Sequence, residues 1–157
     1  MKYWLFVIAL IIVFLSWLHF GSLNLIGNDD VYWHIRYAEQ LLHNLGDFRS
    51  FLMNPTPHTG LLFYLILSLG TLLAPPLIAS KIAGIILAAA VFVVIGVLLD
   101  GLKVRATWLW LILLFVGSLN FSFRLMLTRT FLLSIIFLIL GIYFLIRKNK
   151  WGVGIAG

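Results

Sequence analysis

Long apolar runs, separated by short junctions that hold most of the charge, constrain this chain more than any other feature of its sequence. Of its 157 residues, 63% are hydrophobic and only 10% are charged. A soluble domain of this size has too little interior to bury so much apolar surface. A bilayer accepts such a composition and needs about 20 mostly apolar residues for each span. The sequence therefore predicts an all-α integral membrane protein, a multi-span helical bundle.

Four apolar segments are expected to cross the bilayer, and another begins near residue 151. The first follows Lys2 in the manner of a signal peptide, but residues 16–20 offer no small-x-small cleavage site, so we expect an uncleaved anchor. The shorter segment 61–73 ends before Pro75 and Pro76 and is expected to be re-entrant or interfacial. The expected spans cover about residues 3–20, 82–99, 107–123 and 131–146.

The loop 21–80 is the polar part of the chain. It holds four of the five acidic residues, and a helix is expected over 31–45 within it. Asp29 or Asp30 can cap the start of this helix, and Gly46 can end it. The loop is expected to carry this helix together with the juxtamembrane helix 61–73.

The positions of the basic residues predict a topology. The net charge is +6, and the charges lie at segment ends, which favours contact with anionic lipid over a nucleic-acid partner. Cytoplasmic loops collect Lys and Arg, so Lys2 is placed inside and the acidic loop outside. We expect a multi-pass plasma-membrane protein with a cytoplasmic N-terminus. If 61–79 spans instead, the two later basic loops turn outward. Lys81, at the start of a span, is expected to be an interfacial anchor.

The most informative constellation lies just after the first span, at residues 28–36. Paired carboxylates such as Asp29 and Asp30 can hold a hard divalent cation such as Mg or Mn, or one of them can act as a base. His34 lies one helical turn after Asp30, so both can face the same space. The alternative is that the aspartates only cap a surface helix, while Tyr32 and Trp33 lie in the interfacial aromatic belt.

Arg124 and Arg129 form a second candidate constellation, between two expected spans. Arginines at this depth are costly unless they are paired or hydrated, and arginine is the preferred planar donor to phosphate. On the expected topology they share the outer face with the acidic loop, which indicates a site for a phosphorylated, lipid-linked substrate. The alternative is snorkelling toward lipid headgroups. His58, in the loop before residue 61, is a third candidate, although a lone loop histidine is usually only solvated.

The run Asp30-Val31-Tyr32-Trp33-His34-Ile35-Arg36 resembles an Asp-x-Tyr-Tyr-His-x-Arg pattern found in GT-C glycosyltransferases. The similarity is to the catalytic subunits of oligosaccharyltransferases and their bacterial relatives, in which the pattern directly follows the first span. An arginine-rich segment after the third span of GT-C-like proteins is matched by Arg124 and Arg129. The second acidic metal-binding motif of that segment has no counterpart here. Protein mannosyltransferases and lipid A aminoarabinose transferases are less similar, because His58-Thr59-Gly60-Leu61 replaces their His-Pro-Pro-Leu.

The resemblance implies that residues 1–157 form the N-terminal part of a GT-C-like transmembrane domain, inactive alone. Such an enzyme transfers a sugar from a polyprenyl-phosphate donor to an acceptor on the extracytoplasmic face. Asp30 then corresponds to the catalytic aspartate and a ligand of a divalent cation, with Asp29 beside it. The implied substrate-binding residues are His34, Arg36, His58, Arg124 and Arg129. The alternatives are a non-catalytic scaffold or accessory protein, and part of a transporter in which Asp30 and Arg124 line the substrate path.

Overall fold

The fold is described from a computed structural model, which covers residues 3–21, 30–43 and 60–147. All regular secondary structure in these residues is α-helical, as the composition predicts. The helices are α1 (Tyr3–Gly21), α2 (Asp30–His43), α4 (Leu61–Leu73), α5 (Pro76–Gly101), α6 (Thr107–Gly117), α7 (Leu119–Met126) and α8 (Phe131–Ile146).

Two of the described helices, α1 and α5, are long and apolar enough to cross a membrane. A third span is obtained if α6 and α7, which are separated by a bend of 87°, are counted as one broken span. The helices α4 and α8 are apolar but shorter, and α8 has 16 residues. These helices are compatible with an integral membrane protein.

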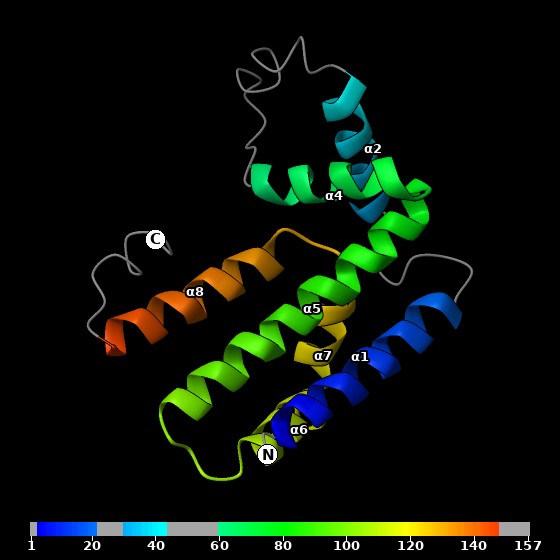
Figure 1. Cartoon of the computed structure of the whole chain (residues 1–157). Coiled ribbons are helices and arrows are strands. Elements are labelled where there is room, and N and C mark those ends of the chain that lie inside the picture. The colour runs from blue at the N-terminus through cyan, green and yellow to red at the C-terminus, as the bar shows by residue number, and fades with distance from the viewer. Residues whose placement is uncertain (1–2, 22–29, 44–59, 148–157) are drawn as a thin grey trace.

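The long helix α5 lies at the centre of the described structure. It packs against each of the other described helices, and it runs between α1 and α8 in Figure 1. The helices α2 and α4 lie together at the N-terminal end of α5, and α6 lies near its other end. Every other described helix therefore contacts α5, while α2 also packs on α4 and α6 on α1.

Small residues on α5 allow this close packing. Ser80, Gly84 and Ala88 are buried and follow one another at intervals of four residues, so they share one face of the helix. Gly96 is also buried, and a Cβ added there would lie 2.7 Å from the Trp4 ring of α1. Small residues at helix contacts let two backbones approach closely, which favours association inside a bilayer.

The turn between α4 and α5 shows why the apolar segment 61–79 is not one helix. The helix α4 ends at Leu73, and the N–H of Ala74 still donates to the carbonyl of Gly70 at 3.1 Å. Pro75 then has no N–H to continue the ladder, and Pro76 is the first residue of α5, where a missing N–H costs little. As a result, α4 lies across the end of α5 (Figure 1).

The expected straight span 107–123 is divided in the structure. The helix α6 ends at Gly117, Ser118 has an extended backbone, and α7 begins at Leu119. Local hydrogen bonds replace part of the interrupted ladder, since Ser118 Oγ accepts from the N–H of Phe121 at 3.3 Å and the Ser122 hydroxyl donates to the Phe115 carbonyl. Serine hydroxyls that bond the backbone in this way compete with helix continuation.

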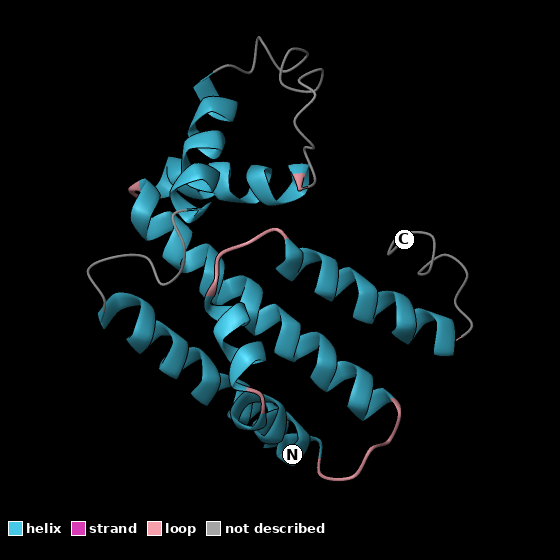
Figure 2. Cartoon of the chain, turned by 180° about the vertical axis from the view of Figure 1, so that it is seen from behind, coloured by secondary structure: helices cyan, strands magenta, loops and turns pink. Residues whose placement is uncertain are grey.

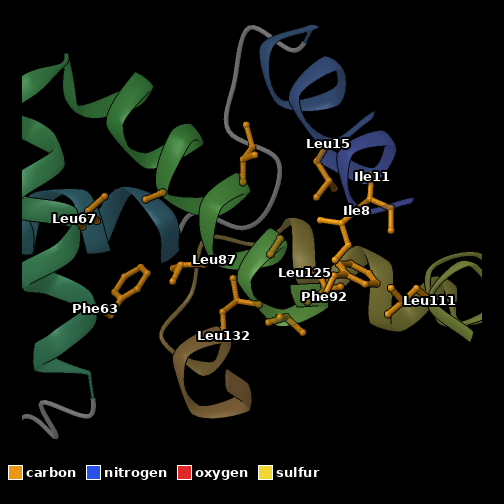
Figure 3. Close-up of a cluster of buried hydrophobic side chains, with 14 of the residues drawn as sticks. Ile8, Ile11, Leu15, Phe63, Leu67, Leu87, Phe92, Leu111, Leu125 and Leu132 are labelled. Atoms are coloured by element: carbon orange, nitrogen blue, oxygen red, sulfur yellow. The ribbon is translucent and has the colours of Figure 1, made fainter. Parts of the chain in front are cut away.

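The core joins the elements around Phe92 of α5, which is fully buried. Its ring meets those of Phe115 and Phe121 edge to face, with centroids 5.8 and 6.3 Å away. Figure 3 shows Phe92 beside Ile8 and Leu125, while the α4 side chains lie at the opposite side of the cluster. One apolar core therefore links both halves of the broken α6–α7 pair to α1 and α5.

The packing at Gly96 gives a first testable prediction. Gly96→Ala forces the Trp4 ring away from α5, and overpacking of this kind costs about 1–3 kcal/mol. Gly117→Ala is the matched control, because a Cβ there meets nothing within 4 Å. Thermal unfolding in detergent, followed by tryptophan fluorescence, should show a lower midpoint for Gly96→Ala alone. Equal midpoints for both variants would contradict the close α1–α5 contact.

Candidate functional site

The polar side chains of interest gather at the N-terminal end of α5. Figures 1 and 2 both place the start of α2 and the segment 127–130, which joins α7 to α8, at this end. The helix α4 packs against both α2 and α5 here. The expected acidic-loop helix and the expected arginine segment are thus on the same side of the described structure.

A histidine–tyrosine pair fixes α2 on α4. The Nδ1 atom of His34 lies 2.9 Å from the phenol oxygen of Tyr64, and the His34 ring meets Phe63 edge to face at 5.4 Å. Burial, with a smaller contribution from nearby Tyr37, raises the pKa of the Tyr64 phenol above its ordinary value. The phenol therefore remains protonated. When it donates to Nδ1, the neutral imidazole carries its proton on Nε2.

The predicted residues of the first constellation are only partly described. Asp30 is the first residue of α2, close to the start expected from the sequence, but its side chain is outside the described part. Asp29 and His58 lie outside the described residues. His34 is half-buried, and Arg36 is exposed. Among the described side chains of this motif, His34 and the buried Ile35 contact other elements.

The two candidate arginines have different environments. Arg124 lies in the last turn of α7 and is exposed. Arg129 is partly buried, with a buried Nε, and it lies between Thr128, which is 2% exposed, and Thr130. Arg129 is therefore the arginine that belongs to the packed end of α5, while the position of Arg124 fits contact with lipid headgroups or solvent.

Two buried basic side chains were not anticipated as site residues. Lys81 is 5% exposed and His19 is 1% exposed. The expectation that Lys81 is an interfacial anchor stays a prediction. The two side chains are close enough to interact electrostatically, and Lys81 Nζ lies 5.9 Å from the centroid of the Phe20 ring. The sequence feature that could have identified these two residues is their position inside apolar segments, where ionisable residues are usually functional.

The segment 127–130 is attached to the same turns of α5. The Thr128 hydroxyl donates to the Ser80 carbonyl at 3.2 Å. Gly84, one turn further along α5, touches both Thr128 and His19, since any added Cβ would meet their side chains. At the other end of the segment, Thr130 packs against Gly60, which has a φ of 132° and precedes α4. Parts of α1, α4 and α5 thus converge on these four residues.

The described residues contain no group of three or more histidine, cysteine or acidic side chains placed to hold a metal ion. This finding does not include the carboxylates of Asp29 and Asp30, which are not described. A divalent cation at Asp30 therefore stays a prediction.

No protein-family model, curated protein or solved structure matches this chain. The likeness to GT-C enzymes accordingly rests on the residues quoted above.

The described polar side chains at this end of α5 include several hydrogen-bond donors. Lysine and arginine are charged donors, and histidine and serine can add neutral ones. His34 adds a ring nitrogen from α2.

The His34–Tyr64 contact gives a second prediction. Tyr64→Phe removes one hydrogen bond and leaves the ring, so it should destabilise the packing of α2 on α4 by about 0.5–1.5 kcal/mol. Hydrogen exchange of the α2 amides should become faster. Tyr3→Phe is the control, because Tyr3 is exposed. The contact would be unimportant if α2 exchanged at the same rate in both variants.

Proposed function

We propose that this protein is a GT-C-like membrane glycosyltransferase, which transfers a sugar from a polyprenyl-phosphate donor to an acceptor on the extracytoplasmic face. One observation carries the proposal. The start of α2, which bears the Asp30-to-Arg36 motif, and the segment holding Arg129 lie at the same end of α5. The sequence alone placed these two motifs about 90 residues apart.

The charges at this end support a phosphate-linked donor. A sugar phosphate in the membrane needs its negative charge neutralised when the glycosidic bond breaks, because the phosphate is the leaving group. Arg129 is partly buried and lies in the segment tied to Ser80 of α5. A positioned guanidinium stabilises developing phosphate charge most effectively where water is partly excluded.

The motif on α2 supplies the residues that act on the acceptor. In the proposed enzyme, Asp30 deprotonates or orients the acceptor, with Asp29 beside it and a divalent cation as a partner of Asp30. His34 is held by Tyr64 on α4 and contributes a donor to the sugar or the acceptor. Arg36 and His58 complete the proposed set of substrate contacts. The proposed orientation has the N-terminus in the cytoplasm and this end of α5 outside.

A transporter is the second candidate, favoured by the broken helix pair. Discontinuous helices often border substrate sites in transporters, and α6 and α7 are bent by 87° around Ser118. Substrate-dependent flux into vesicles containing the protein distinguishes the two candidates, since a transferase moves a sugar to an acceptor and needs no flux.

Replacing the first residue of α2 tests the enzymatic proposal. Asp30→Asn in the full-length gene product should lower transfer from a labelled polyprenyl-phosphate sugar by about 10²–10⁴-fold, because it removes a base. Donor binding should be retained. Glu39→Gln is the matched control, since it changes another carboxylate on the same helix and should alter transfer by less than about threefold. Wild-type transfer by Asp30→Asn would exclude a catalytic role for Asp30. A chelator added to the same assay tests the divalent cation.

The different burial of the two arginines gives a further prediction. Arg129→Gln should lower kcat/KM for the lipid-linked donor by about 10–100-fold, as expected for a lost charge-assisted hydrogen bond. Arg124→Gln should change it by less than about threefold, because exposed charges contribute little. The reverse order of effects would assign the carrier phosphate to Arg124 instead.

A further inference from the structure

An open apolar groove lies between α1 and α6, which Figure 1 places side by side near the start of α1. Two adjoining hollows, of about 440 and 230 Å³, share Leu10 of α1 and Ile112 of α6 in their walls, so they form one groove. All of the lining side chains are aliphatic or aromatic. Leu10 is 53% exposed and Ile112 is 36% exposed, so the groove opens away from the core. In a bilayer, an apolar partner has to fill it.

The groove extends through only half the depth of a membrane. It begins at Tyr3 and Trp108 and ends at Phe14 and Val116. From Tyr3 to Phe14, α1 rises roughly 16 Å at about 1.5 Å per residue. The hydrocarbon core of a bilayer is about 30 Å thick, so one leaflet is about 15 Å. The groove stops there because α6 ends at Gly117 and the chain bends by 87° into α7. A transmembrane partner helix needs a face through both leaflets, whereas an acyl chain fits within one.

The charge at one end of the groove indicates the headgroup. Tyr3 and Trp108 are of the residue types enriched where a membrane meets water. Lys103 and Arg105 are exposed in the loop that leads from α5 into α6, shortly before Trp108. Asp100, in the last turn of α5, offsets one of these charges, and the junction 100–106 stays positive. Basic residues beside a membrane span attract anionic lipid headgroups.

We propose that the groove between α1 and α6 holds an acyl chain of an anionic phospholipid, whose headgroup lies against Arg105 and Lys103. The groove lies near the end of α5 opposite the candidate functional site, so it is separate from the proposed donor and acceptor positions. In the proposed orientation it faces the cytoplasmic leaflet, which carries anionic lipids. Because the chain contacts both helices, a bound lipid stabilises the packing of α6 on α1.

Fluorescence quenching by brominated lipids tests which lipid fills the groove. The full-length protein is placed in phosphatidylcholine nanodiscs that contain either brominated phosphatidylglycerol or brominated phosphatidylcholine with the same acyl chains. Trp108 lines the groove, and its share of the quenching is the difference between the wild type and Trp108→Phe. We expect brominated phosphatidylglycerol to quench Trp108 more strongly, and to do so in a saturable way.

Two arginine variants test the headgroup contact. Arg105→Gln should lower the preference for phosphatidylglycerol over phosphatidylcholine about fivefold, because one basic contact to the anionic lipid is lost. Arg147→Gln is the matched control. It removes the same charge from an exposed position across α5 from α1, where the Arg147 guanidinium lies 5.1 Å from the centroid of the Tyr143 ring. An equal loss in both variants would mean that only diffuse surface charge attracts the lipid.

Two leucine variants test the acyl-chain contact. Leu10→Phe narrows the groove and should reduce the quenching of Trp108 by both brominated lipids. Leu138→Phe is the control, because it makes the same change on α8, outside the groove. Leu10 is 53% exposed and Leu138 is 64% exposed, so both variants should fold. Unchanged quenching in Leu10→Phe would place the acyl chain elsewhere.

Two results for the wild type would also overturn the site. Equal quenching by the two brominated lipids rejects a preference for an anionic headgroup. Weak quenching of Trp108 by both lipids means that protein, such as a second copy of this chain, covers the groove. These measurements include no sugar transfer, so the lipid site and the proposed glycosyltransferase can each fail while the other stands.

Discussion

The packing of α5 against every other described helix is the constraint on which the rest of the structure depends. In a bilayer, apolar side chains gain little by leaving lipid, so close van der Waals contact must hold the helices together. Ser80, Gly84, Ala88 and Gly96 provide that contact because they let α1 and the segment 127–130 approach the α5 backbone. The same small residues that pack the bundle also bring polar groups of three elements to one end of α5. Packing and the candidate site therefore both depend on close approach to the α5 backbone.

Some elements could be predicted closely from the sequence. The bounds expected for the apolar segments 61–73 and 131–146 coincide with α4 and α8, since each run is bounded by residues that favour an end. Pro75 and Pro76 marked the start of α5, although the helix begins six residues earlier than the expected span at 82. The break at Ser118 was missed because it interrupts a continuous apolar run without a proline. Its cause is a pair of serine hydroxyls bonded to the backbone, which periodicity does not reveal.

One described contact of the candidate site involves a residue that the sequence singled out. The spacing of Asp30 and His34 indicated a common face of one helix, and the structure shows His34 held by Tyr64. Burial of Lys81 and His19 was not predictable, because it depends on how α1 meets α5 and on the small volume of Gly84. The two arginines looked equivalent in the sequence, and in the structure Arg129 differs from Arg124 by its partial burial and by its place beside Thr128, which bonds Ser80. Tertiary packing thus decides which polar residues of an apolar chain belong to a site.

The placement of these basic groups also bears on why the chain tolerates them. Lysine and histidine inside apolar helices reduce stability unless their charge is offset or they have polar partners. Lys81 lies about one turn before Gly84, where an added Cβ would meet the side chains of Thr128 and His19, so α1 and the segment 127–130 approach α5 closely there. Because the same close packing encloses the buried basic groups at this end of α5, their polar partners have to come from within the packed helices.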